Sequence, residues 1–207
     1  MHSIGARAGL KKIEQFFDGH APSWDAMTGP GHGARLMALL SALPWRRGGC
    51  WLDVGCGTGV MWPVIRAHAG GDARITAVEL SAQMLRHVPE ARRGMALAVH
   101  ADALTPPFRD GSFDGVLCNS CFPHFEDQPR AMAVMARLAA PGGMVAVCHS
   151  ECRAAINERH HRVGGVVGGH DLPDLPEMGV LMAAAGLVVT RLSDAPEGYL
   201  AVGMRPE

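Results

Sequence analysis

A short apolar stretch that runs directly into three closely spaced glycines most constrains how this chain can fold. Residues 51–54 are largely apolar, and Gly55, Gly57 and Gly59 follow at alternate positions. Glycines let the backbone turn sharply and approach a ligand closely, and the start of a following helix offers free backbone N–H groups. A buried strand, a glycine turn and a helix from about residue 60 therefore predict an α/β fold with a small-molecule site at this turn.

Strand-like and helix-like segments alternate along the rest of the chain. The predicted strands are residues 50–54, 75–79, 97–100, 113–118, 144–149, 187–192 and 199–204. The predicted helices are residues 33–42, 60–69, 82–87, 130–139 and 176–185. This alternation favours a mostly parallel sheet with helices on both faces. Residues 193–198 are too few for a crossover helix, so we expect the last two strands to form an antiparallel hairpin.

Length, composition and charge narrow the functional class. The 207 residues, 48% of them apolar, suit one domain with one core. A formal charge of -1 argues against nucleic acid as a partner and against binding to anionic lipid. Residues 1–21 hold no signal-peptide-like run, and no apolar stretch approaches the ~18 residues of a membrane span. We therefore expect a cytoplasmic protein without membrane insertion, its six cysteines reduced.

An acidic residue ends the second predicted strand. The carboxylate of Glu79 can accept hydrogen bonds from both hydroxyls of a ribose, which implies a nucleoside ligand. The dinucleotide fingerprint G-x-G-x-x-G requires a glycine at position 60, where this chain has Val60, and Gly59 comes one residue early. The turn therefore departs from the dinucleotide pattern.

The pattern Asp53-x-Gly55-x-Gly57-x-Gly59 resembles motif I of the class I S-adenosylmethionine-dependent methyltransferases. Glu79 is similar to the second acidic position of that family, and residues 100–103 to its adenine-side motif. Residues 114–119 resemble its fourth strand and residues 140–143 its turn before strand five. The resemblance implies a Rossmann-like α/β fold: seven strands in the order 3-2-1-4-5-7-6, the last antiparallel, with helices on both faces. It also implies S-adenosylmethionine as cofactor.

Two aromatic–acidic pairs near the N-terminus are similar to the "FD…WD" cap of the small-molecule subgroup, the quinone and sterol-like methyltransferases of type 11. The pairs are Phe17-Asp18 and Trp24-Asp25. The resemblance implies a cap over the methionine end of the cofactor, where Phe17 and Trp24 exclude water. Aromatic residues at helical spacing also occur as plain packing, and this alternative stays open.

The resemblance assigns roles to the matched residues. Asp53 and the glycines hold the amino-acid end of the cofactor, Glu79 its ribose and Asp102 its adenine amino group. The residues expected to bind the cofactor are Trp24, Asp53, Gly55, Cys56, Gly57, Gly59, Glu79, Leu80, Met84, Asp102, Ala103 and Asn119.

Methyl transfer from a sulfonium mainly requires alignment of donor and acceptor and exclusion of water. A base helps if the acceptor is a hydroxyl, an amine or an acidic carbon, and histidine is the usual choice. Ligands in such sheets bind beyond the carboxyl ends of the strands, where His124 and His149 lie. We predict these two as catalytic residues, for acceptor orientation or proton removal, with Glu151 as a weaker candidate base.

Two cysteines near these histidines suggest a second hypothesis. Cys121, His124, His149 and Cys152 have mirrored Cys-x-x-His and His-x-x-Cys spacings at neighbouring strand ends. Such a set can bind a soft or borderline metal, or a metalloid substrate. The competing interpretation is an ordinary acceptor pocket in which the cysteines act as small apolar residues.

A histidine-rich stretch follows the fifth strand and precedes a glycine-rich loop. On a helix Asn157, His160 and His161 share one face, since they stand at i, i+3 and i+4. With Cys121, they are predicted to bind the methyl acceptor, the alternative being a solvated polar face. The quinone and sterol-like enzymes lack a comparable insert.

These observations predict one methyltransferase domain over residues 1–207. Its parts are an N-terminal helical cap (1–45), a cofactor-binding core (46–149), a His/Gly-rich substrate insert (150–175) and a C-terminal helix and hairpin (176–207). The expected function is methyl transfer to a small-molecule acceptor. The alternatives are a non-catalytic nucleoside-binding protein and a metal- or metalloid-handling protein. The identity of the acceptor and the oligomeric state stay open.

Overall fold

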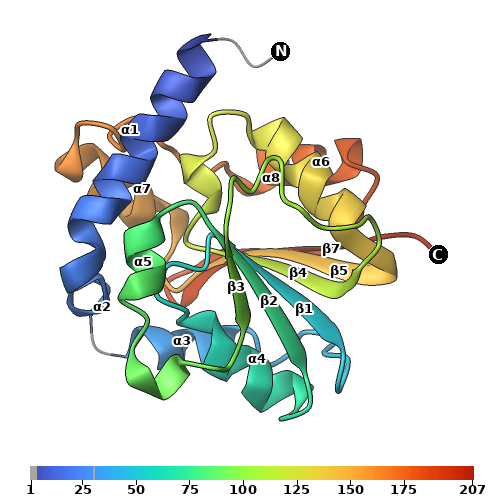
Figure 1. Cartoon of the computed structure of the whole chain (residues 1–207). Helices are drawn as coiled ribbons and strands as arrows, with labels where there is room; N and C mark the ends of the chain where they lie inside the picture. The colour runs from blue at the N-terminus through green and yellow to red at the C-terminus, as the bar shows by residue number, and fades with distance from the viewer. Residues whose placement is uncertain (1–3, 30) are drawn as a thin grey trace.

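Seven strands form one sheet at the centre of the molecule (Figure 1), in a computed structural model that describes residues 4–29 and 31–207. The strand order is β3-β2-β1-β4-β5-β7-β6, which confirms the predicted order. The strands are β1 (Cys50–Val54), β2 (Arg74–Glu79), β3 (Leu97–His100), β4 (Phe113–Asn119), β5 (Ala139–His149), β6 (Val188–Ala195) and β7 (Gly198–Met204). The first five pair in parallel, while β7 runs antiparallel to both β5 and β6.

The fifth strand begins earlier than expected. Its pairing with β4 passes from Phe113 opposite Ala139 to Gly115 opposite Met144, so residues 140–143 bulge out of the ladder. Gly142 has φ 69° there, a left-handed conformation that favours glycine. The segment predicted as a turn before the strand is therefore a bulge within it.

Helices cover both faces of the sheet, as predicted (Figure 1). They are α1 (Ile4–His20), α2 (Trp24–Met27), α3 (His32–Leu39), α4 (Met61–Ala69), α5 (Ala82–Arg86), α6 (Gln128–Leu138), α7 (Arg153–Val163) and α8 (Leu175–Ala184). Short 3₁₀ turns occur at η1 (Ala21–Ser23), η2 (Glu90–Arg92) and η3 (Phe122–His124).

The core has two layers because successive strand residues point to opposite faces. Leu52 and Val116 pack on the face covered by α6 and α8, while Trp51 and Leu117 pack on the face covered by α3 and α4. All four side chains are 0% exposed. This double-sided burial explains why the central strands read as continuous apolar runs.

The N-terminal helices lie across the carboxyl ends of the strands, with α1 beside α5 (Figure 1). Ser81 is the N-cap of α5, and its hydroxyl accepts the backbone N–H of Met84 at 3.0 Å. The Asp18 carboxylate of α1 accepts from the Ser81 hydroxyl at 2.5 Å and from the Gln83 N–H at 3.2 Å. This contact fixes α1 to the start of α5.

No helix among residues 4–29 and 31–207 has the length and apolar character needed to cross a membrane.

Candidate active site

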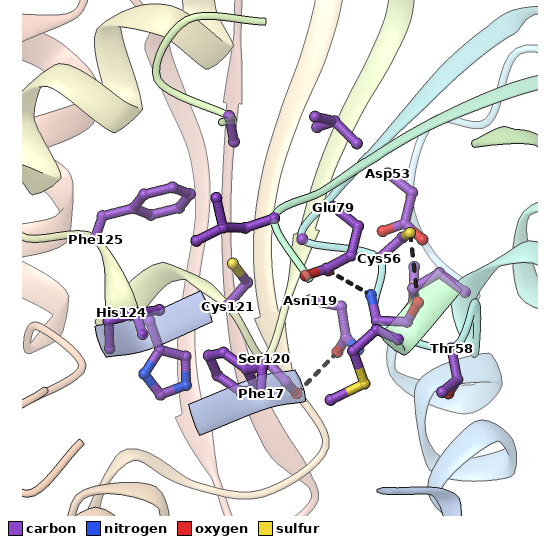
Figure 2. A pocket seen from close by; sticks show the side chains of 18 of the residues that line it. Phe17, Asp53, Cys56, Thr58, Glu79, Asn119, Ser120, Cys121, His124 and Phe125 are labelled. Carbon is purple, nitrogen blue, oxygen red and sulfur yellow. Dashed lines mark hydrogen bonds between the residues drawn. The ribbon is translucent and has the colours of Figure 1, made fainter. Parts of the chain in front are cut away.

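A cavity opens at the carboxyl ends of β1, β2 and β4, beneath the cap formed by α1 and α2. Thirteen of the residues predicted for the site line it, and Figure 2 shows many of their side chains. They are Trp24, Asp53, Gly55, Cys56, Gly57, Glu79, Leu80, Met84, Asp102, Ala103, Asn119, Cys121 and His124. Acidic and polar groups gather around Asp53 and Glu79, whereas His124 and Phe125 lie on the other side (Figure 2).

The glycine turn forms the floor of the polar side. Gly55 has φ 66°, and its N–H and that of Cys56 donate to the carbonyl of Val78, at 2.9 and 3.2 Å. A Cβ at position 55 would lie 2.2 Å from the Cys121 Sγ, so only glycine fits against that thiol. Cys121, predicted to bind the acceptor, thus packs against the turn at the middle of the cavity.

Gly59 is not among the lining residues, unlike the other two glycines of the motif. Its N–H donates to the Cys56 carbonyl at 2.8 Å, and its φ is 82°. A Cβ there would lie 2.7 Å from the Trp62 ring on α4. Gly59 therefore serves the turn and the packing of α4. It does not line the cavity in which the predicted cofactor contact would lie.

Glu79 joins the end of β2 to the glycine turn. Its Oε2 accepts the N–H of Gly57 and its Oε1 accepts the N–H of Ser81, both at 2.8 Å. Burial raises the pKa of Glu79, and these backbone hydrogen bonds oppose the shift. Each carboxylate oxygen keeps a second lone pair for a ligand hydroxyl.

Asp53 is the most unusual group of the site. It is 1% exposed, and neither carboxylate oxygen has a hydrogen-bond partner among the residues that the structure describes. Burial, followed by the nearby charge of Glu79, raises the pKa of Asp53 to about 7, while the Trp62 indole lowers it without forming a hydrogen bond of normal geometry. A buried carboxylate without partners is costly, and a cationic ligand group would pair with it. The residues thus fit the ammonium of an amino-acid ligand.

Asp102 and Asn119 complete the polar side. The Asp102 Oδ1 accepts the N–H of Leu104 at 2.8 Å, which leaves the other oxygen for a ligand amino group. Asn119 ends β4, and its Oδ1 accepts from the Ser120 hydroxyl at 3.3 Å. Ser120 has φ 54°, the one positive value among the non-glycine residues that the structure describes. This strained residue turns the chain from β4 into η3.

Aromatic residues of the cap close the cavity from above. The ring of Phe17 makes an edge contact with Trp24, with centroids 5.6 Å apart, and another with His124 at 5.1 Å. Phe17 and Trp24 both line the cavity, as expected of residues that exclude water. Their predicted contact with a cofactor stays a prediction.

The two predicted catalytic histidines occupy different environments. His124 lines the cavity, and its Nδ1 lies 3.2 Å from the Nδ1 of His170. His149 does not line it, and its side chain is 1% exposed. Neither ring nitrogen has a hydrogen-bond partner in the described part of the chain, and the ring lies 6.2 Å from that of Tyr199. Burial lowers the pKa of His149 to about 3. The structure thus separates His149 from the cavity that His124 faces.

The structure does not bring together the four residues of the hypothesised metal or metalloid site. In the described part of the chain, no three or more His, Cys, Asp or Glu side chains are arranged to hold a metal ion. Cys121 packs on the glycine turn, His149 is buried beside Tyr199, and Cys152 is the N-cap residue of α7. The mirrored spacings fail because the two strand ends direct these side chains to different surroundings.

The predicted acceptor-binding face of α7 binds the chain's own loop. The Asn157 amide donates to the Leu172 carbonyl at 3.3 Å and accepts its N–H at 2.9 Å. His160 donates from Nδ1 to the carbonyl of His170 at 2.5 Å, and His161 pairs with Asp171 at 3.0 Å. These side chains hold residues 164–172 in place, and their predicted contact with the acceptor stays a prediction. We call this segment the His170 loop.

Some lining residues were not predicted. Asp25 and Thr58 line the cavity and hydrogen bond to each other, and Arg92 lies 2.9 Å from the Asp25 carboxylate. His32 also lines it and shares a 2.7 Å hydrogen bond with Ser150. The sequence feature that could have identified Asp25 is its place as the acidic residue of the Trp24-Asp25 pair. Arg92 and His32 carry no local motif, since only the fold brings them to the site.

Comparison with known proteins agrees with this architecture. Residues 52–147 match a family model described as "Methyltransferase domain". A demethylmenaquinone methyltransferase from Thermus thermophilus is 31% identical over 140 residues, which make up 61% of this chain and 60% of that protein. The chain spans about half the length of the curated relatives it matches, from 24% to 60%.

Solved structures share the fold at low sequence identity. Phosphoethanolamine N-methyltransferase 2 of Haemonchus contortus, in complex with S-adenosyl-L-methionine, has a TM-score of 0.74 and 15% identity, over 100% of this chain and 61% of that one. The [4+2]-cyclase SpnF has a TM-score of 0.75 and 18% identity, over 94% and 95% of the two chains. The family match, the relatives and these solved structures together support a class I S-adenosylmethionine-dependent methyltransferase.

Proposed function

We propose that this protein transfers a methyl group from S-adenosylmethionine to a small-molecule acceptor. The observation that carries the proposal is Asp53, a fully buried carboxylate without a partner at the wall of a cavity that Glu79 and Asp102 also line. Three carboxylates in this order suit the ammonium, the ribose hydroxyls and the adenine amino group of the donor. When bound, the donor supplies a methyl carbon activated by the sulfonium.

The chain's own residues bind, orient and shield the reactants. Asp53 and the glycine turn hold the amino-acid end, Glu79 the ribose and Asp102 the adenine. Phe17 and Trp24 cover the cavity and exclude water, which is the main requirement for displacement at an activated carbon. His124 lines the cavity on its less polar side, and its Nδ1 lies against the Nδ1 of His170.

Apolar side chains around His124 support a small acceptor of apolar character. Leu10, Ile13, Phe17 and Phe125 line the cavity, and the Phe17 ring contacts that of His124 with centroids 5.1 Å apart. The relatives include a protein named as a demethylmenaquinone methyltransferase, which supports a small organic acceptor. A small organic acceptor is therefore the partner that we propose.

Calorimetry with S-adenosylhomocysteine, the demethylated donor, tests the proposal. We expect wild-type protein to bind it and Asp53→Ala to lose at least about tenfold in affinity, since a charge-assisted contact to a buried group is worth about 1.5–3 kcal/mol. Asp72→Ala, at an exposed aspartate away from the cavity, is the matched control. Absence of binding to the wild-type protein would contradict the proposal.

Catalysis is tested separately from binding. The fold neighbour SpnF is named as a cyclase, so this fold is not tied to one reaction. Release of S-adenosylhomocysteine with a panel of small acceptors would support methyl transfer. Tight binding of the donor with no turnover on any acceptor would favour the alternative, a non-catalytic nucleoside-binding protein.

A further inference from the structure

Three histidines from separate segments meet at the less polar side of the cavity. His124 comes from η3, His160 from α7 and His170 from the His170 loop. The ring centroids of His124 and His160 are 4.9 Å apart, and those of His124 and His170 are 5.4 Å apart. Of the three, His124 lines the cavity, so the other two stand behind it.

Hydrogen bonding restricts where the protons of this cluster lie. A carbonyl oxygen only accepts, so the Nδ1 of His160 carries a proton that it donates to the His170 carbonyl at 2.5 Å. The Nδ1 atoms of His124 and His170 face each other at 3.2 Å, so a single proton lies between them. When that proton belongs to His124, the Nε2 of the same ring is unprotonated and free to accept from a ligand in the cavity.

The surroundings favour uncharged rings. Burial, followed by His160, His170 and His149, lowers the pKa of His124 well below its ordinary value. Burial and His160 lower the pKa of His170, while Glu126 raises it. Arg159 lies near His160, whose pKa is also lowered by burial. At neutral pH the His124–His170 pair is therefore neutral and can accept a proton.

We propose that His124 and His170 form a proton relay that takes a proton from the methyl acceptor and delivers it to solvent. This inference rests on the function proposed above. The acceptor's O–H bond breaks and its proton binds His124 Nε2, while the oxygen electron pair forms the bond to the methyl carbon. The carbon–sulfur bond breaks, and its electron pair stays on sulfur.

The proton then leaves through the His170 loop. His124 passes its Nδ1 proton to the Nδ1 of His170, and the Nε2 proton of His170 goes to water. His170 is half-buried and stands near the exposed Glu126, so its far side reaches solvent. His170 acts through His124 and is a positioning residue, whereas His124 contacts the acceptor.

The strength of this base points to the class of acceptor. A histidine with a lowered pKa removes only a fairly acidic proton with useful efficiency. A phenolic hydroxyl, with a pKa near that of tyrosine at about 10, is within reach, and an alkyl hydroxyl is not. Because Leu10, Ile13, Phe17 and Phe125 line the same cavity and Phe17 contacts the His124 ring, the site suits a phenol on an apolar frame.

Nitrogen NMR of histidine-labelled protein tests the relay without an acceptor. We expect His124 to carry its proton on Nδ1 in the wild-type protein, and His170→Ala to give a mixture of the two neutral tautomers. His170→Asn, whose amide oxygen can still accept from Nδ1, restores the single tautomer. His87→Ala, at an exposed histidine of the α5 end, is the control and leaves His124 unchanged. A His124 proton on Nε2, or no response to His170→Ala, overturns the inference.

Kinetics separate a relay from a purely structural contact. With phenol as acceptor, both His170→Ala and His170→Asn should lower kcat by about 10–100-fold with unchanged KM, since proton transfer contributes about 10²–10⁴-fold. With 4-nitrophenol assayed at about pH 8, where it is largely ionised, the loss should shrink to about threefold or less. A loss of equal size on both phenols would overturn the relay.

A binding measurement keeps the two proposals apart. The affinity of the His170 variants for S-adenosylhomocysteine, measured by calorimetry, should equal that of the wild-type protein. If the wild-type protein itself fails to bind, the proposed function fails, whereas normal binding with an unresponsive His124 tautomer overturns the relay alone.

Discussion

The Asp25 Oδ2 lies 2.9 Å from the Arg92 Nη1, which joins cap helix α2 to η2 on the body of the domain. Arg92 also donates to the Thr58 carbonyl at 3.1 Å, and the Thr58 hydroxyl bonds to Asp25. Since Thr58 belongs to the glycine turn, one arginine connects the cap to the floor of the cavity. This contact and the Asp18–Ser81 bond are two separate anchors of the cap.

Removal of the Arg92 side chain should increase the mobility of the cap while changing the free energy of unfolding only slightly. We expect Arg92→Ala to cost about 1 kcal/mol or less in free energy of unfolding, because the pair is partly exposed to solvent. Hydrogen exchange in residues 18–29 should nevertheless rise, and affinity for S-adenosylhomocysteine should fall about threefold to tenfold, which corresponds to about 0.7–1.4 kcal/mol. Arg93→Ala, which breaks an exposed pair with Glu90, is the control. Unchanged exchange in the cap would refute this link.

The substitution Gly55→Ala should abolish binding of the donor. Two effects add at this position, a φ of 66° and a Cβ that would lie 2.2 Å from the Cys121 Sγ. Gly94→Ala separates them, because Gly94 has φ 75° and nothing within 4 Å of its Cβ. We expect Gly94→Ala to cost about 1 kcal/mol from backbone strain alone and Gly55→Ala clearly more.

Chemical denaturation of both variants measures this difference, and calorimetry with S-adenosylhomocysteine measures binding. Gly94→Ala should bind normally. Equal stability of the two variants would show that the contact with Cys121 is unimportant. A Gly55→Ala protein that binds as well as the wild type would count against the turn as the floor of the donor site.

Sequence patterns identified the polar side of the cavity because its residues lie in continuous motifs. The glycine turn and Asp102 follow strands, and Glu79 ends one. The apolar character of these strands fixes their positions in a parallel sheet, so the strand ends meet at one edge. The structure confirms the strand order, and it places Asp53 at this edge as well.

The other side was less predictable because it depends on side-chain direction and on distant segments. His149 pairs with Tyr199 of β7 in the antiparallel ladder, and its ring packs there. Helical spacing correctly grouped Asn157 and His160 on one face of α7. It did not reveal the partner of that face, because Leu172 lies in a loop that only the folded chain brings back.

Asp53 should make stability and binding respond oppositely to pH. The pKa of Asp53 is raised from 3.8 to about 7 in the folded state, so ionisation disfavours that state. Stability should therefore fall as pH rises from about 4 to about 7, by a few kcal/mol at most, since one pKa unit corresponds to about 1.4 kcal/mol. Binding of a donor ammonium needs the ionised carboxylate and should weaken below about pH 7.

Thermal unfolding of Asp53→Asn and of the control Asp72→Asn between pH 5 and pH 8 checks the stability effect. Asp53→Asn should gain stability relative to the wild type, and more at pH 8 than at pH 5. A constant difference across this range would mean that Asp53 does not titrate there.

Loss of the Asn157 side chain should release the His170 loop while the sheet stays intact. Asn157→Ala removes two hydrogen bonds to Leu172, each worth about 1 kcal/mol, so the free energy of unfolding should fall by about 1–3 kcal/mol. Amide exchange should increase in residues 164–172 and stay slow in the central strands. Glu158→Ala, which breaks an exposed pair with Arg162 on the same helix, is the matched control and should leave the loop protected. Because the loop carries His170, the same variant should also give mixed His124 tautomers by NMR. If the loop stays protected in Asn157→Ala, then His160 and His161 hold it without help from Asn157.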